Sequence, residues 1–215
     1  AQASGIRQFL DLGSGLPTVG NVHQVAQRAD PTTRVVSVDC EPVAAEYTQS
    51  LLVDSATAGM VLADLRDLDM ICGHPQTQRL LDFSQPTAIL LISVLHFVPG
   101  DLGGLMTGLR RLMAPGSLLV LTHATPAAST DQRDGIAAVY ANTATPLHLR
   151  TPTEIRALLA GLDLVHPGPN ADGVAELVPV TDWRPDAGSA PLAATVTDSP
   201  LLTGFLAGAG WSPHP

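Results

Sequence analysis

Apolar, strand-like runs alternate with helical segments along most of the chain, and this alternation constrains the fold more than any other feature of the sequence. The run at 87–98 is almost continuously apolar, which is typical of a strand that is covered on both faces. Five such strand–helix alternations favour parallel strands joined by right-handed crossovers. We therefore predict a doubly wound α/β sheet, in which ligands bind at the carboxyl ends of the strands.

The same patterns predict where the elements lie. Strands are expected at 6–12, 33–39, 58–67, 87–98, 117–123 and 162–168, with a closing antiparallel pair from 174–186 and 201–211. Helices are expected at 19–29, 42–52, 69–81, 101–113, 134–144 and 151–162. The third helix should be interrupted near Gly73 and Pro75, and the last begins with a capping-box pattern at Thr151 and Glu154. Residues 185–200 should form a surface loop.

The composition limits the class of protein and its partners. With 215 residues, of which 45% are hydrophobic, the chain can form one domain over 1–215 with a substantial core. The net charge of -9 argues against a nucleic-acid partner, and no apolar run reaches the roughly 20 residues that span a bilayer. Cys40 and Cys72 have neither disulfide nor metal spacing, and no signal peptide is visible. We expect a cytoplasmic protein that binds no metal. A homo-oligomer is an open alternative to a monomer.

The stretch FLDLGSGLPT, residues 9–18, runs from an apolar strand into a glycine turn. Gly13 and Gly15 leave the backbone bare, so that a ligand can approach the main-chain amides. A dinucleotide-binding G-x-G-x-x-G motif would place a third glycine at position 18, where Thr18 stands instead. The turn therefore disfavours a nicotinamide oxidoreductase, and a purely structural turn is the other alternative.

The second predicted strand ends in SVDCEP, which places Asp39 at the edge of the sheet. Asp39 lies 24 residues after Gly15, close to the spacing of about 20 residues at which an acidic side chain reaches a ribose. A carboxylate suits this task because it can accept hydrogen bonds from both hydroxyls of the sugar. Glu41 is the neighbouring alternative, and Asp39 could instead only cap the following helix.

Further candidates follow the later strands. Asp64, in ADLRD, can accept a hydrogen bond from an exocyclic amine such as that of adenine. Leu95 and His96 follow the fourth strand, and His123 ends the fifth. His96 could equally form only a backbone hydrogen bond.

A general base is needed only where the reacting group must lose a proton. His123, His96 and Tyr140 are the candidates for that role. Tyr140 and Arg150 could contact an anionic substrate, or they could be ordinary surface residues. His23 lies on an apolar helix face and is expected in the core.

These motifs occur in the order that is typical of class I methyltransferases that use S-adenosylmethionine. From Gly5 to Asp186 the chain resembles the actinobacterial S-adenosyl methyltransferase family, formerly a domain of unknown function. GLPT, NVH and LHFVP make the resemblance specific because they are not general features of nucleotide-binding folds. The matching stretches are GIRQFLDLGSGLPT, NVHQVAQ, DPTTRVVSVDCEP, ADLRD, LLDFSQPTAILLISVLHFVP, LRRLMAPGSLLVLTHAT and DWRPD.

The resemblance implies a Rossmann-like, mostly parallel sheet of seven strands whose last strand is antiparallel. It also implies a methyltransferase that uses S-adenosylmethionine and acts on a small-molecule acceptor, with secondary metabolism as a candidate setting. Carried onto this chain, it implies cofactor contacts for Gly13 and Gly15 (methionine part), Asp11 (amino group), Asp39 (ribose), Cys40 (adenine face), Asp64 and Leu65 (adenine), and Leu95 and His96 (pocket floor).

The chain departs from the family pattern at two places. Family members carry an N-terminal helical segment with a Gly-Gly-Lys-Asn type motif, and we expect it to be missing here because the chain begins about five residues before the first strand. Cys40, Glu41 and Pro42 stand where the family has Asn-Asp-Pro. The alternative function is a methyltransferase-fold protein without methyl transfer, either a binding module or an isomerase or cyclase.

Overall fold

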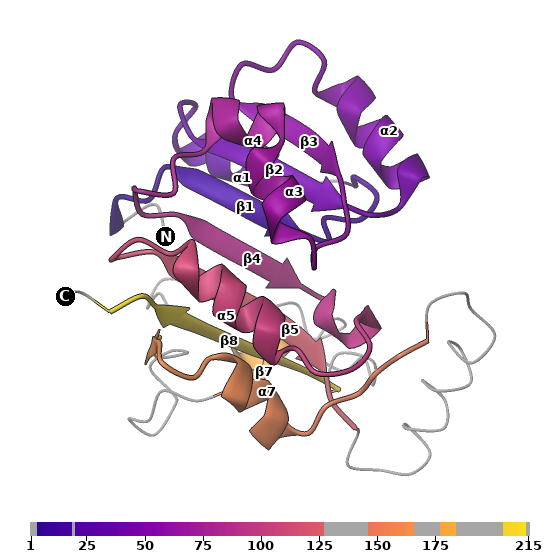
Figure 1. The fold of residues 1–215 in the computed structure, drawn as a ribbon, viewed down its shortest axis with the longest axis vertical. Helices are drawn as coiled ribbons and strands as arrows, with labels where there is room; N and C mark the ends of the chain where they lie inside the picture. Colours follow the sequence, from indigo (N-terminus) through magenta and orange to yellow (C-terminus); the bar gives the residue numbers. More distant parts are fainter. Residues whose placement is uncertain (1–3, 19, 127–145, 166–176, 184–203, 214–215) are drawn as a thin grey trace. The chain divides into compact units, whose positions relative to one another are not determined.

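The structure, a computed structural model, describes residues 4–18, 20–126, 146–165, 177–183 and 204–213 (Figure 1). It divides into two compact units. The first lies within Ala1–Ile92, Gly103–Leu119 and Ser212–Pro215, and the second lies within Ser93–Leu102 and Val120–Trp211. That residues 1–215 form a single domain stays a prediction. Among the helices of the described residues, none has both the length and the apolar character that a membrane span requires.

The first unit contains four parallel strands in the order β3-β2-β1-β4. Apolar side chains fill the sheet, and Leu10, Val36 and Ile89 are completely buried. This burial explains why the nearly continuous apolar runs form strands here. The strands are β1 (Gln8–Leu12), β2 (Arg34–Asp39), β3 (Ala58–Leu62) and β4 (Ala88–Ile92).

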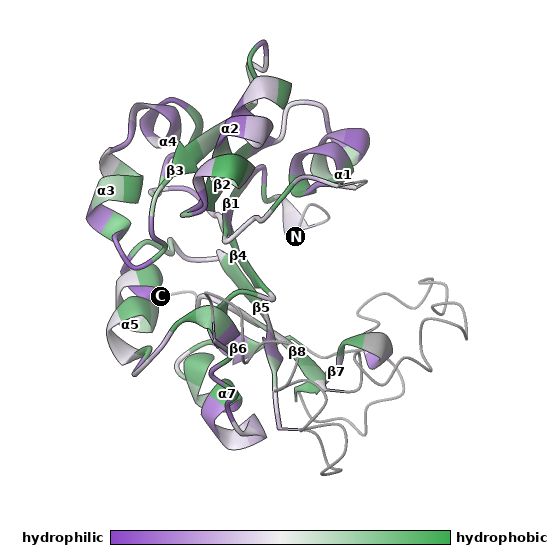
Figure 2. Ribbon diagram, turned by 90° about the vertical axis from the view of Figure 1, so that its right-hand side faces the viewer, coloured by the Kyte–Doolittle hydropathy of each residue, from purple (hydrophilic) through white to green (hydrophobic). Residues whose placement is uncertain are grey.

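Helices cover both faces of these strands, with α1 and α2 on one side and α3 and α4 on the other (Figure 2). The interruption predicted near Gly73 and Pro75 is confirmed, since α3 ends at the first and α4 begins at the second. Helix α1 starts three residues later than predicted, because the Gln24 side chain binds the backbone N–H groups that precede the helix. The helices are α1 (Val22–Ala29), α2 (Pro42–Leu51), α3 (Leu68–Gly73), α4 (Pro75–Leu80) and α5 (Gly103–Arg111).

Strand β4 is shorter than the apolar run that predicts it. The strand ends at Ile92, and Ser93 takes a left-handed backbone with φ of 54°. A 3-10 turn, η2 (Leu95–Phe97), buries Leu95 and His96 in place of strand residues. The Ser93 backbone N–H donates to the Thr122 Oγ1 at 2.8 Å, and a hydrogen bond of 3.1 Å joins the two hydroxyl groups, so that both bonds hold this bend.

The second unit is built around β8 (Phe205–Trp211), which pairs antiparallel with β6 (Asp163–Leu164) and β7 (Val178–Pro179). The predicted closing antiparallel pair is therefore confirmed. Strand β5 (Leu118–Ala124) runs from the first unit into the second. Helix α7 (Pro152–Leu158) begins with the predicted capping box of Thr151 and Glu154, and η3 (Val180–Asp182) follows β7.

The predicted fold class, a mostly parallel sheet with an antiparallel last strand and flanking helices, is confirmed. The described residues contain eight strands, as many as the apolar pattern predicts and one more than the family resemblance implies, and two of them, which pair with β8, are very short. The helix predicted at 134–144 and the loop predicted at 185–200 lie outside the described residues.

Candidate functional site

The glycine turn follows β1 in the first unit and is fixed by β2. Gly13 and Gly15 both have left-handed backbones, with φ of 74° and 66°. The backbone N–H groups of Gly13 and Ser14 donate to the Val38 carbonyl oxygen at 2.8 and 3.0 Å. The Gly15 N–H donates to Oδ2 of Asp39 at 2.7 Å. These three N–H groups are therefore already engaged, and a ligand at the turn would meet Cα atoms and side chains instead.

Asp39 joins the glycine turn to the start of α2. Its Oδ2 accepts the Gly15 N–H, and its Oδ1 accepts the Glu41 N–H at 2.9 Å. Each carboxylate oxygen has a second lone pair, so the pair of oxygens can still accept hydrogen bonds from a vicinal diol. Both of the predicted alternatives for Asp39, a cap at the helix start and a sugar-binding group, are compatible with this geometry.

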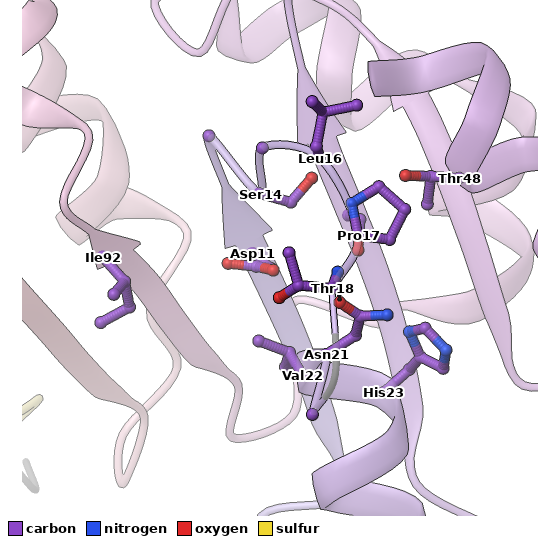
Figure 3. Close-up of a pocket in the computed structure, with 14 residues that line it drawn as sticks. Asp11, Ser14, Leu16, Pro17, Thr18, Asn21, Val22, His23, Thr48 and Ile92 are labelled. Atoms are coloured by element: carbon purple, nitrogen blue, oxygen red, sulfur yellow. Dashed lines mark hydrogen bonds between the residues drawn. The ribbon is translucent and has the colours of Figure 1, made fainter. Parts of the chain in front are cut away.

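A cavity of about 210 Å³ lies beside the turn (Figure 3). Its walls come from the end of β1, the turn itself, the first residues of α1, and single residues of β2, α2 and β4. This volume is below the range of about 300–1,000 Å³ that encloses a drug-sized ligand, so the cavity suits one arm of a larger molecule.

Asp11 is the buried acid of this cavity. Burial, with the Asp39 charge as a second cause, raises the pKa of Asp11 from its ordinary value of 3.8 to about 7. Among the described residues, no hydrogen bond to its carboxyl group offsets this rise. A buried acid with a raised pKa in a cavity is typical of a functional site, since a positively charged group would compensate its charge.

Two buried hydroxyl groups of the cavity wall also lack partners. Within the described ranges, neither the Ser14 Oγ nor the Thr48 Oγ1 forms a hydrogen bond. Both side chains are among those drawn around the cavity in Figure 3. Neither residue is among those that the sequence predicts for the site. A signal existed for Thr48, because it lies one helical turn after Ala44 on the buried face of α2.

His23 does not lie in the core, contrary to the expectation from the helix pattern. It is half-buried and lines the same cavity, because α1 begins only one residue before it. Partial burial lowers the pKa of its imidazole, which is therefore neutral at pH 7.

The predicted adenine-side residues lie at the ends of β2 and β3. The carboxylate of Asp64 is held by a fork of the Arg66 guanidinium, with Nε donating to Oδ1 at 2.9 Å, and these bonds lower the pKa of Asp64. Cys40 is an exposed free thiol, whose pKa is raised by partial burial and then by the nearby Asp39 and Asp64 charges. Leu65 is buried. Asp39, Cys40 and Asp64 are thus close enough to interact electrostatically.

Arg150 organises the predicted residues of the second unit. Its guanidinium donates to the carbonyl oxygens of Leu95, Val98 and Gly100 at 2.9, 3.0 and 2.8 Å. It also donates to Nε2 of His123 at 3.0 Å. Both terminal nitrogens of the guanidinium are thus engaged, which differs from the expectation of an ordinary surface residue. A contact with an anionic substrate stays a prediction.

The hydrogen bonds determine the tautomers of both histidines. Because the Arg150 guanidinium can only donate, the proton of His123 must be on Nδ1, which donates to the Ala124 carbonyl oxygen at 2.6 Å. His96 accepts the Ala124 N–H at Nδ1, at 3.4 Å, so its own proton is on Nε2. Burial is the main cause that lowers the pKa of each imidazole to about 4. Both rings are neutral at pH 7.

These placements bear on the predicted catalytic residues. His123 is completely buried and both of its ring nitrogens are engaged, which favours a positioning role for it. His96 offers a donor rather than a base, as its Nδ1 is occupied. Tyr140 lies outside the described residues.

Comparisons with known proteins agree with this geometry. The profile of the S-adenosyl methyltransferase family matches residues 1–208. A Thermobifida fusca protein, provisionally assigned as a methyltransferase, is 35% identical, with a TM-score of 0.83 over 99% of this chain and 75% of its own. A Streptomyces avermitilis protein of the DUF574 family is 33% identical, with a TM-score of 0.83 over 99% of this chain and 78% of its own.

More distant structures show the same fold. Geranyl diphosphate C-methyltransferase from Streptomyces coelicolor, crystallised with S-adenosyl-L-homocysteine, is 15% identical, with a TM-score of 0.57 over 94% of this chain and 69% of its own. No curated protein is significantly similar to the chain. The family match over nearly the whole sequence is decisive: the chain belongs to the S-adenosyl methyltransferase family and is a methyltransferase whose cofactor is S-adenosylmethionine.

Proposed function

We propose that the protein methylates a small-molecule acceptor and holds the cofactor at the carboxyl ends of β1, β2 and β3. The observation that carries this proposal is the cavity beside the glycine turn, with its buried acid, Asp11. The net charge of -9 supports a small acceptor over a nucleic acid. Secondary metabolism is the setting that we propose for the acceptor.

The residues of the first unit fit the cofactor by the chemistry of their side chains. Asp11 would face the ammonium of the aminoacyl arm, beside the Cα atoms of Gly13 and Gly15. Asp39 would accept the ribose hydroxyls with its remaining lone pairs. Asp64, Leu65 and Cys40 would lie around the adenine, and we propose Leu95 and His96 as the floor of the pocket. The size of the cavity supports enclosure of the arm alone.

When bound, S-adenosylmethionine supplies a methyl group on a positively charged sulfur. The leaving sulfide is neutral, so the protein contributes mainly by orienting the reactants and excluding water. The pKa of about 4 for both His96 and His123 argues against either imidazole as a general base at neutral pH. We propose that His96 orients the acceptor by donating from Nε2, and that His123 positions the surrounding backbone.

Calorimetric titration with S-adenosylhomocysteine tests the proposal. We expect micromolar binding by the wild type and a loss of at least about tenfold in Asp39→Ala, because the carboxylate would bind two hydroxyls. Asp82→Ala is a matched control, since the Asp82 carboxylate also accepts a nearby backbone N–H, that of Ser84, but lies at the opposite end of the strands. No binding by the wild type would overturn the proposal.

The alternative of a binding module, isomerase or cyclase makes a different prediction. It requires bound S-adenosylhomocysteine together with no methylated product from any acceptor in a broad panel. Saturable NADH binding, measured by fluorescence, would instead support the nicotinamide alternative that Thr18 disfavours.

A further inference from the structure

The carboxyl ends of β2 and β3 carry a group of acidic side chains that the site described so far uses only in part. Asp39 ends β2, and Asp64 follows β3 by two residues. Three further acids, all exposed, stand at the starts of the helices that follow: Glu41 before α2, and Asp67 and Asp69 at α3. Because β2 and β3 are parallel, these five residues lie at the same side of the sheet, and we call them the acidic edge.

The charges of the acidic edge act together. After partial burial, three of these carboxylates raise the pKa of the Cys40 thiol, namely Asp39, Asp64 and Glu41. The Asp67 backbone N–H donates to the Asp64 carbonyl oxygen at 2.9 Å, which keeps Asp67 beside the same group. A charged ligand that approaches these strand ends therefore meets several negative charges at once.

Little of this charge is compensated by the protein. Arg66 forms an ion pair with Asp64. In the part of the chain that the structure describes, no ion pair involves Glu41, Asp67 or Asp69. Asp67 caps α3 by accepting a backbone N–H, but this bond leaves the charge of the carboxylate in place.

The amino ends of the same strands carry arginines instead. Arg7 lies just before β1, and Arg34 is the first residue of β2. Arg79 donates to the carbonyl oxygens of Ala56 and Ala58, where β3 begins, at 2.9 and 3.4 Å. A strand of six residues is about 20 Å long, whereas charges are screened over about 8 Å at physiological ionic strength. A ligand at the acidic edge therefore meets the local negative charge rather than the charge of the opposite end.

An independent observation inside the cavity indicates the same sign of ligand. Asp11 lines the cavity, is 7% exposed, and has no hydrogen bond to its carboxyl group among the described residues. The charge of Asp39 also acts on it. A buried carboxylate without a partner is stabilised by a cation, so the cavity and the acidic edge outside it both favour a positively charged ligand.

We propose that the acidic edge steers the cofactor by its net charge, so that S-adenosylmethionine is captured faster than the product S-adenosylhomocysteine. This inference rests on the proposed function, which places the cofactor at these strand ends. The ammonium and carboxylate of S-adenosylmethionine cancel, and its sulfonium leaves one net positive charge. When the methyl group is transferred, the sulfur keeps the electron pair of the broken bond, and the product is neutral overall. A negative surface accelerates the encounter with the cation but exerts no net attraction on the neutral product.

Surface plasmon resonance measures the association rate constants of both ligands with the immobilised protein. Between about 0.01 and 0.5 M ionic strength, we expect the constant for S-adenosylmethionine to fall about tenfold and that for S-adenosylhomocysteine to change less than about twofold. At low ionic strength, Asp67→Asn/Asp69→Asn should lower the constant for S-adenosylmethionine about threefold and leave that for S-adenosylhomocysteine unchanged. Asparagine also caps helices well, so α3 should keep its start.

The chain offers a control with the same change of net charge. Asp54, after α2, and Asp82, before β4, are exposed acids at the amino ends of the strands. Asp54→Asn/Asp82→Asn removes the same charge as the first double variant, but about a strand length away from the acidic edge. It should leave the association rate constants of both ligands unchanged, because the distance exceeds the screening length at physiological ionic strength.

The outcomes distinguish this inference from the function on which it rests. The same dependence on ionic strength for both ligands would overturn the steering while the cofactor site stands. An equal loss for both ligands in Asp67→Asn/Asp69→Asn would assign these acids to a contact or to the fold, and would also overturn it. An equal loss of S-adenosylmethionine capture in the control variant would mean that only the net charge matters. Failure of the wild type to bind either ligand would overturn the proposed function itself.

Discussion

Strand β1 carries two buried polar side chains, Gln8 near its amino end and Asp11 near its carboxyl end, and their surroundings are opposite. The two residues are 1% and 7% exposed. Gln8 is surrounded by hydrogen-bond partners, whereas no described residue donates a hydrogen bond to the carboxyl group of Asp11. Three positions along one strand therefore separate a polar group that stabilises the fold from one that is available to a ligand.

The amide of Gln8 illustrates complete pairing. Its Nε2 donates to the carbonyl oxygens of Asp82 and Gln85 and to the Thr87 hydroxyl, at 2.6, 3.2 and 2.8 Å. Its Oε1 accepts from the Arg34 guanidinium and from the Asp82 N–H, at 3.2 and 3.0 Å. In a parallel α/β sheet, ligands bind at the carboxyl ends of the strands, so the amino ends can be optimised for stability alone.

The largest expected effect comes from the paired end of the strand. Gln8→Leu should lower the free energy of unfolding by about 4 kcal/mol, because the Asp82 N–H loses its acceptor and the buried Thr87 hydroxyl loses its donor. Urea denaturation followed by circular dichroism measures this. A loss below about 1 kcal/mol would show that the two ends of β1 do not differ as we describe.

The unpaired end should give a stability that depends on pH. Because the pKa of Asp11 is raised from 3.8 to about 7, the folded state holds a proton that the unfolded state has lost between these values. The lowered pKa values of His96 and His123 act in the opposite direction in this window, so the quantity to measure is the difference between the wild type and Asp11→Asn. Relative to Asp11→Asn, the free energy of unfolding of the wild type should fall by about 3 kcal/mol as the pH rises from 4 to 7, and level off above that. A difference that rises or stays constant through this window would contradict the burial argument.

Ligand affinity should rise with pH, which is the direction opposite to the effect of Asp11 on stability. The ionised carboxylate of Asp11 attracts an ammonium group, so wild-type affinity for S-adenosylhomocysteine should rise about tenfold between pH 6 and pH 8. Titration calorimetry at several pH values measures the change, with 5′-methylthioadenosine as the amine-free control. A rise of the same size in Asp11→Asn would assign the effect to another group.

The smallest expected effect is the difference in stability between two Thr→Val variants, one at a hydroxyl with hydrogen-bond partners and one at a hydroxyl without them. The Thr87 hydroxyl accepts from Gln8 and donates to the Gln85 carbonyl oxygen, so Thr87→Val should cost about 1 kcal/mol. Thr48→Val should cost nothing, since its hydroxyl is unpaired in the described structure. The difference between the two variants in urea midpoint is the measurement. Equal costs would mean that pairing does not decide the effect.

The sequence predicts the architecture well because burial decides it. The apolar runs that become β1, β2 and β4 are buried on both sides, and this pattern is local in the sequence. The end of β4 was predicted too far along the chain. Leu95 and His96 are as buried in a 3-10 turn as they would be in a strand, so hydrophobicity alone cannot separate the two.

The candidate site is predictable only in part. The glycine turn and Asp39 follow from spacing, and the structure brings them into direct hydrogen-bond contact. The hydrogen-bond partners of a side chain cannot be predicted from spacing, because they come from residues that are distant in the sequence. His123 ends a strand as predicted, yet Arg150, 27 positions later, occupies the nitrogen that a base would need. The free hydroxyls of Ser14 and Thr48 likewise emerge only in three dimensions.

The bond from the Gly15 amide to the Asp39 carboxylate has a spectroscopic consequence. The chemical shift of an amide proton depends on the charge and distance of its acceptor. A new hydrogen bond from a sugar hydroxyl to the Asp39 carboxylate should therefore change the chemical shift of the Gly15 amide. Adenosine alone, which has a sugar but no amino acid, should therefore move the Gly15 signal in a ¹⁵N spectrum. Under the role that we propose for Asp39, the Gly15 amide would report nucleoside binding without a known methyl acceptor.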